Sequence, residues 1–189
     1  MAERNKAPER RPNEEADGEL QAFFVVIRGP LGSGKTTISK ELSRLYDAVY
    51  ISVDEVLDGF GLEEWEDGYI AKRSFLRVNE IVAKEAIKHL DSGKLVIFDG
   101  NFYFKDVIVD LMNRLNKFRG IVLTLTVPLE ECIRRDSSRH AVLGEEKTRR
   151  VYKKSTEFRT GIEVDADKEP KEIVRSISRI LNRELDREL

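Results

Sequence analysis

The feature that most constrains this chain is a glycine-rich octapeptide, GPLGSGKT at residues 29–36. A continuous apolar run at residues 23–27 precedes it, and such a run predicts a strand buried on both faces. An amphipathic pattern follows from Lys35 to about residue 46, which predicts a helix. The octapeptide therefore joins a buried strand directly to a helix.

The spacing Gly-x4-Gly-Lys-Ser/Thr is typical of a loop that binds phosphate. Glycines let the backbone wrap an anion and turn its N–H groups inward. The helix that follows also directs its positive end at the anion. Lys35 can then reach the β- and γ-phosphates, and the Thr36 hydroxyl can bind Mg²⁺. The sequence therefore predicts that the chain binds a nucleoside triphosphate.

The rest of the chain alternates between strand and helix patterns. Further strands are expected at residues 49–53, 95–98, 121–127 and 162–164. Helices are expected at about residues 69–90, 107–115, 129–135 and 145–158, and from residue 170 onward. This alternation predicts an α/β fold, a parallel sheet with helices on both faces. A length of 189 residues suits one domain, at residues 21–189. Residues 1–20 are polar and charged, and we expect a disordered tail there.

Composition excludes several classes of protein. One cysteine excludes a disulfide framework, and two histidines disfavour a multi-histidine metal site. No apolar segment is long enough to span a membrane, so we expect a cytoplasmic protein without a membrane partner. A net charge of −2 gives no overall attraction to nucleic acid.

Polar residues follow the predicted strands at the edge where ligands bind in parallel sheets. Asp54 follows the second strand and can act as a general base toward an attacking hydroxyl, or it caps the next helix. Asp99 ends the third strand and can hold Mg²⁺, or it is a turn residue before Gly100. Asn101 can bind substrate or order its loop.

These residues together resemble the P-loop kinases that phosphorylate hydroxyl groups. The nearer group comprises polynucleotide 5′-kinase, zeta toxin and chloramphenicol phosphotransferase, and shikimate, gluconate and adenylylsulfate kinases are more distant. The resemblance rests on the phosphate loop, Val53-Asp54, FDGN at residues 98–101 and the segment 127–139. It implies a three-layer P-loop NTPase fold with a five-stranded parallel sheet in the order 2-3-1-4-5, and a lid at about residues 135–150.

The resemblance also implies ATP and Mg²⁺ as ligands and a role for each candidate residue. Lys35, Asp54 and Arg139 are the expected catalytic residues, and Thr36 and Asp99 the expected metal ligands. The expected nucleotide-binding residues are Gly29, Leu31, Gly32, Ser33, Gly34, Lys35, Thr36, Thr37, Arg135 and Arg139.

The chain departs from polynucleotide kinases at two places. Leu57 stands where those enzymes carry an arginine three residues after the base, and Asp136 replaces an asparagine. Arg73 or Arg77, on the next predicted helix, can take the place of the missing arginine. The expected substrate-binding residues are therefore Asp54, Arg73, Arg77 and Asn101.

The segment 54–67 indicates the kind of acceptor. It holds seven acidic residues and no lysine or arginine, so it should repel a polyanion if it borders the acceptor site. This favours a small neutral or cationic hydroxyl compound over a nucleic-acid end. Four aromatic residues can wall the acceptor pocket or simply pack: Phe60, Trp65, Phe102 and Tyr103.

Two other functions remain open. The chain can be a nucleotide-gated switch or ATPase, although it lacks the Asn/Thr-Lys-x-Asp motif of guanine-specific GTPases. It can also be a binding module that holds ATP without catalysis. The leading hypothesis is an ATP-dependent kinase that phosphorylates a hydroxyl group.

Overall fold

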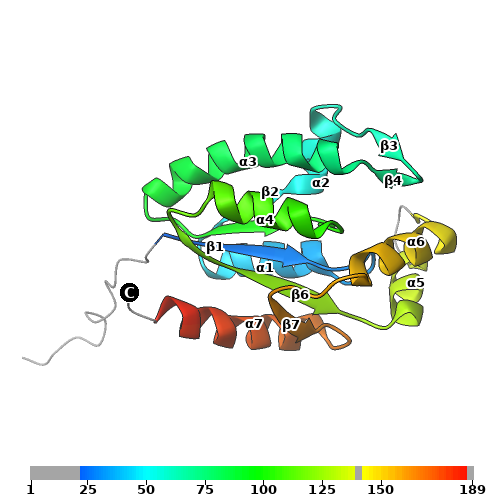
Figure 1. Cartoon of the computed structure of the whole chain (residues 1–189). Coiled ribbons are helices and arrows are strands. Elements are labelled where there is room, and N and C mark those ends of the chain that lie inside the picture. The colour runs from blue at the N-terminus through cyan, green and yellow to red at the C-terminus, as the bar shows by residue number, and fades with distance from the viewer. Residues whose placement is uncertain (1–21, 139–141, 187–189) are drawn as a thin grey trace, which may run out of the picture.

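The computed structural model describes residues 22–138 and 142–186 (Figure 1). The strands in these ranges are β1 (Phe23–Arg28), β2 (Val49–Ser52), β3 (Trp65–Glu66), β4 (Tyr69–Ile70), β5 (Val96–Asp99), β6 (Arg119–Thr126) and β7 (Ile162–Asp165). The helices are α1 (Lys35–Leu45), α2 (Val53–Gly59), α3 (Lys72–Asp91), α4 (Lys105–Arg114), α5 (Leu129–Ser137), α6 (Glu145–Thr156) and α7 (Pro170–Leu185). The expected alternation of strands and helices is confirmed.

Five strands form one parallel sheet in the order β2-β5-β1-β6-β7. Counted among these five strands alone, the order is 2-3-1-4-5, and the labels differ because a separate two-stranded hairpin, β3–β4, intervenes. The register places Asp99 beside Ile27 of β1 and Ser52 of β2. The carboxyl ends of these three strands therefore meet at one edge.

Helices cover both faces of the sheet, which gives three layers (Figure 1). Successive side chains of β1 point to opposite faces of the sheet, and all of them are buried. Phe24 and Val26 pack with residues of α2, α3 and α4, whereas Val25 and Ile27 pack with residues of α1 and α7. The central strand is thus buried on both sides, and its carboxyl end leads directly into the phosphate loop.

The hairpin β3–β4 corrects the prediction of one long helix from about residue 69. Trp65 pairs with Ile70 and Glu66 with Tyr69, so residues 69 and 70 are extended. Asp67 and Gly68 connect the strands with φ values of 50° and 79°. An Asp-Gly pair with positive φ is the preferred two-residue turn of a hairpin, because its twist matches that of the strands. The helix consequently begins only at Lys72.

Two predictions fall outside the described residues: the tail at residues 1–20 and the lid arginine Arg139. Of the expected lid at residues 135–150, the structure describes the end of α5 and residues 142–150, which include the start of α6. Within the described part of the chain, no helix combines the length and apolarity needed to cross a membrane.

Candidate active site

The phosphate loop folds as the glycine pattern requires. Gly32 and Gly34 have φ values of 79° and 90°, which favour glycine because a Cβ is strained there. A Cβ on Gly32 would lie 2.5 Å from the carbonyl oxygen of Cys132 in α5. Gly34 immediately precedes α1, so the phosphate loop runs directly into the N-terminus of this helix. This arrangement can bind an anion.

Lys35 lies at the centre of a chain of polar contacts. Its Nζ donates to the carbonyl of Pro30 at 3.0 Å and to Oδ1 of Asn101 at 3.2 Å. The side-chain amide of Asn101 donates in turn to Oδ2 of Asp54 at 3.0 Å. The structure thus brings together three residues that the sequence predicted as site residues and that come from the segments following β1, β2 and β5. Asn101 links the lysine of the phosphate loop to the expected base.

Asp54 lies in the first turn of α2 rather than at the end of β2, which stops at Ser52. The Ser52 hydroxyl caps the helix by accepting from the N–H of Glu55 at 3.2 Å, so Asp54 is not the cap. Asp54 Oδ1 is buried without a hydrogen-bond partner among the described residues. Asp54 lines the first cavity, so the carboxylate there has one oxygen with unused hydrogen-bonding capacity.

The environment of Asp54 stabilises its protonated form relative to an aspartic acid in water. Burial raises the pKa of its carboxyl to about 6, against the opposing effect of the Lys35 charge. The carboxylates of Asp99 and Glu63 add to the rise. A pKa near the working pH suits a group that takes a proton from a hydroxyl and later releases it.

Asp99 and Thr36 have the chemistry of a magnesium site. The Thr36 hydroxyl donates to Asp99 Oδ2 at 2.7 Å, and the hydroxyl of Tyr50 donates to the same oxygen at 3.0 Å. Asp99 Oδ1 is buried and has no partner within the described ranges. Hydroxyl and carboxylate oxygens are the ligands that Mg²⁺ prefers. These residues fit a metal held beside the phosphate loop.

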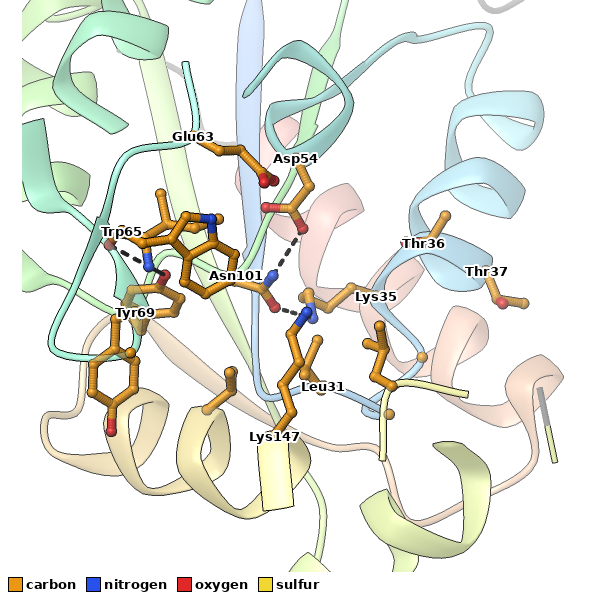
Figure 2. A pocket seen from close by; sticks show the side chains of 17 residues that line it. Leu31, Lys35, Thr36, Thr37, Asp54, Glu63, Trp65, Tyr69, Asn101 and Lys147 are labelled. Carbon is orange, nitrogen blue, oxygen red and sulfur yellow. Dashed lines mark hydrogen bonds between the residues drawn. The ribbon is translucent and has the colours of Figure 1, made fainter. Parts of the chain in front are cut away.

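Two cavities adjoin the phosphate loop and share Gly34 and Thr37 in their linings. The first, of about 330 Å³, is lined by loop residues together with Asp54, Glu63, Trp65, Asn101, Tyr103 and Lys147 (Figure 2). The second, of about 500 Å³, is lined by Ser33, Arg134, Arg135, Lys168 and neighbouring residues. The phosphate loop therefore borders two separate cavities, which can take a nucleotide and an acceptor.

Arg135 is placed beside the second cavity. Its guanidinium donates to Glu131 at 2.6 Å and to the carbonyl of Ala166 at 3.1 Å. One of its nitrogens lies 4.0 Å from the position that a Cβ on Gly34 would take. The structure therefore leaves Arg135 near the loop, as its expected role in nucleotide binding requires.

Asp136, which stands where the polynucleotide kinases carry an asparagine, has a structural role here. It is buried and accepts from the backbone N–H groups of Leu143, at 3.1 Å, and Gly144, at 2.9 Å. Gly144 immediately precedes α6. The carboxylate thus fixes α6 to the end of α5.

Arg73 and Arg77 do not line either of these cavities. Both are exposed and form ion pairs with Glu64, and Arg73 also pairs with Glu66. The expectation that they bind substrate gains no support from this geometry, because both guanidinium groups pair with Glu64 outside the two cavities.

The four candidate aromatic residues divide into two kinds. Trp65 and Tyr103 line the first cavity. Phe102 is completely buried in the core, and Phe60 is 63% exposed and lines neither of the two cavities. Of these four candidates, only Trp65 and Tyr103 can therefore form a wall of an acceptor pocket.

Three residues with a part in the site were not singled out from the sequence. Tyr50 orients Asp99, and Lys147 of α6 reaches the first cavity. Arg28 is completely buried and donates to the carbonyls of Phe102 and Ser155, at 3.3 and 2.6 Å. Arg28 thereby ties the loop after β5 to the end of α6.

The comparisons with known proteins agree with this geometry. A family model described as "AAA domain" matches residues 25–156, from β1 to the end of α6. The chain belongs to this family. The match includes the phosphate loop and every residue that the structure joins to Lys35 and Asp99.

Curated relatives of this AAA domain protein include kinases. Adenylate kinase of Methanosarcina barkeri is 31% identical over 126 residues, which cover 61% of this chain and 58% of that protein. Shikimate kinase of Mannheimia succiniciproducens is 28% identical over 152 residues, which cover 75% and 79%. The chain spans 27% of a bifunctional shikimate kinase/3-dehydroquinate synthase from Thermotoga maritima. It therefore covers less than two thirds of the first and third of these proteins.

Solved structures support the P-loop kinase fold. A gluconokinase from Sinorhizobium meliloti superposes with a TM-score of 0.70 at 15% identity, covering 88% of this chain and 95% of that one. An APS kinase from Mycobacterium tuberculosis gives a TM-score of 0.65 at 14% identity, covering 84% and 96%. At these identities the likeness concerns the fold alone. The narrower resemblance to the polynucleotide kinase and zeta toxin group stays a prediction.

Proposed function

We propose that this protein is an ATP-dependent kinase that transfers the γ-phosphate of ATP to a hydroxyl group of a small molecule. The observation that carries the proposal is the position of Asp54. Asp54, whose Oδ1 has no partner among the described residues, lines the same cavity as the phosphate loop, and Asn101 joins it to Lys35 through hydrogen bonds. The kinase relatives and the fold support the same conclusion.

In the proposed reaction, the acceptor hydroxyl gives its proton to Asp54 as its oxygen attacks the γ-phosphorus. The bond from that phosphorus to the bridging oxygen of ADP breaks, and the product is a phosphate monoester. Lys35 and the N–H groups of the loop stabilise the developing negative charge. Thr36 and Asp99 would hold Mg²⁺, which supplies further positive charge when it is bound.

Lys147 supplies a further cation for the phosphates. Its side chain comes from α6 and lines the first cavity, as does that of Lys35 (Figure 2). The neighbouring basic residues of α6 pair with acids of the same helix: Arg149 with Glu145 and Arg150 with Glu146. Lys147 has no ion pair within the described part of the chain, so its charge is available to a phosphate. Arg139, which the resemblance assigns to phosphate contact, stays a proposal.

A transfer assay tests the proposal. The full-length protein is incubated with γ-labelled ATP, Mg²⁺ and a panel of sugars, polyols, nucleosides, shikimate and oligonucleotides with a 5′-hydroxyl, beside a reaction with ATP alone. We expect label in a small molecule, and loss of that transfer in Asp54→Asn. Label on the oligonucleotide end would support the polynucleotide kinase alternative. Release of inorganic phosphate alone, at one rate with every acceptor, would instead support a nucleotide-hydrolysing switch.

A further inference from the structure

The seven acidic residues of segment 54–67 do not share one environment. Glu64 and Glu66 are held by the arginines of α3, and Glu55 lies 3.9 Å from Lys40. Of the seven acidic residues, only Asp54 and Glu63 line the first cavity. The negative charge at the cavity therefore comes from two carboxylates, and the other five acidic residues of the segment lie outside its lining.

Glu63 is directed at the expected reaction centre. Figure 2 shows its carboxylate turned toward that of Asp54. Burial is the main cause of the raised pKa of both Asp54 and Tyr103. The charge of Glu63 adds to the rise in each case. Within the described ranges Glu63 forms no ion pair or side-chain hydrogen bond. A carboxylate so placed can accept hydrogen bonds from a compound in the cavity.

Trp65 provides an apolar surface in the same cavity. Its side chain lines the cavity, yet the residue is 55% exposed. A bound compound that covers the indole would remove apolar area from water, at about 25 cal/mol per Å². The ring offers a flat face of the kind that packs against the C–H groups of a cyclic compound. Glu63 and Trp65 thus offer a hydrogen-bond acceptor and a packing surface side by side.

The charges around the cavity disfavour an ionic acceptor. No arginine of the described chain lines this cavity, and its two cations are Lys35 and Lys147. Lys35 belongs to the phosphate loop, so a carboxylate or phosphate on the acceptor would face Asp54 and Glu63. A cationic group over the indole would instead meet Lys147, whose Nζ lies 5.6 Å from the ring centroid.

We propose that the acceptor is a neutral polyhydroxylated compound the size of a monosaccharide, with Glu63 accepting from hydroxyls beside the reacting one and Trp65 packing on its C–H face. The proposal rests on the proposed kinase function. A cavity of about 330 Å³ suits this size, because ligand sites of small molecules begin at roughly 300 Å³. Glu63 and Trp65 are then specificity-determining residues that leave the nucleotide side untouched.

The chain offers a direct binding signal, because Trp65 is its one tryptophan. Neutral hexoses, pentoses and cyclic or linear polyols are titrated into the full-length protein with ADP and Mg²⁺, and indole fluorescence is followed. Each is compared with its carboxylate and amine analogues, such as glucose with gluconate and glucosamine. We expect at least one neutral compound to change the fluorescence, with its charged analogues binding tenfold or more weakly.

Substitutions test the two residues by kinetics. With the neutral acceptor, Glu63→Gln and Trp65→Ala should each raise the acceptor KM about tenfold and leave the KM for ATP within twofold. Glu66→Gln and Phe60→Ala are matched controls from the same segment outside the cavity, and we expect both KM values to stay within twofold.

The two proposals fail in different ways. Preference for a charged analogue, fluorescence unchanged by every neutral compound, or an unchanged acceptor KM in Glu63→Gln would overturn the inference about the acceptor. Transfer to some other hydroxyl compound in those cases would leave the kinase proposal intact. Binding of a neutral compound without formation of any phosphate ester would overturn the kinase proposal and support this acceptor site.

Discussion

Replacing Asp54 with asparagine should stabilise the ligand-free protein at neutral pH and abolish phosphoryl transfer. Burial raises the pKa of this carboxyl from 3.8 to about 6, so ionising it in the folded protein is unfavourable. At about 1.4 kcal/mol per pKa unit, this shift corresponds to about 3 kcal/mol. An amide of the same shape is neutral at every pH, and it can still accept from Asn101.

The sign of the pH dependence follows from the two pKa values. In the unfolded chain Asp54 loses its proton near pH 3.8, and in the folded protein near pH 6. The folded wild type therefore binds more protons between these values, and Asp54 lowers the free energy of unfolding as the pH rises through this window. The advantage of Asp54→Asn should reach about 3 kcal/mol near pH 7, with more than about 2 kcal/mol of it gained between pH 4 and pH 7, and then level off.

Urea unfolding of both proteins at several pH values between 4 and 8, without ATP or Mg²⁺, measures this difference. Other carboxyl groups titrate in both proteins, so their contributions cancel. A stability difference that stays constant across the range would refute the assignment of a raised pKa to Asp54. In the wild type, kcat/KM should also fall below about pH 6, because only the carboxylate accepts the proton.

Further substitutions probe the loop, the metal site and the packing. Lys35→Met should weaken ATP binding at least tenfold by calorimetry, with unchanged circular dichroism, and an unchanged affinity would argue against phosphate contact. Asp99→Asn should raise the Mg²⁺ concentration needed for half-maximal activity at least tenfold, and an unshifted Mg²⁺ titration would exclude Asp99 as a ligand. Arg28→Met leaves the buried carbonyls of Phe102 and Ser155 without this donor, and it should lower the free energy of unfolding by about 3 kcal/mol, measured in urea. A change below about 1 kcal/mol would contradict the stabilising role of Arg28.

The residues at the centre of the site could be predicted from the sequence because the order of strands in the sheet brings them together. Residues that follow β1, β2 and β5 must meet once these strands are parallel neighbours, so the positions of Lys35, Asp54, Asp99 and Asn101 along the chain suffice to group them. The hairpin β3–β4 also had a local signal, the Asp67-Gly68 pair, which the helical pattern of the following residues obscured.

Other parts of the site depend on long-range packing that spacing does not encode. Arg28 resembles any basic residue at a strand end, yet its guanidinium is buried against a carbonyl 127 residues away. Lys147 is one of many cations on α6, and only the packing of α6 near the hairpin distinguishes it. The acidic segment shows the same limit, because ion pairs with Arg73 and Arg77 hold Glu64 and Glu66, and neither carboxylate lines the cavity.

The most direct test of the account is the fate of the γ-phosphate, followed by ³¹P NMR in a reaction of full-length protein, ATP, Mg²⁺ and a neutral polyol that changes Trp65 fluorescence. We predict one phosphate monoester for each ADP formed, and no monoester when Asp54→Asn replaces the wild type. ADP accompanied by an equal amount of inorganic phosphate, at the same rate with and without the polyol, would contradict a kinase acting on a hydroxyl group.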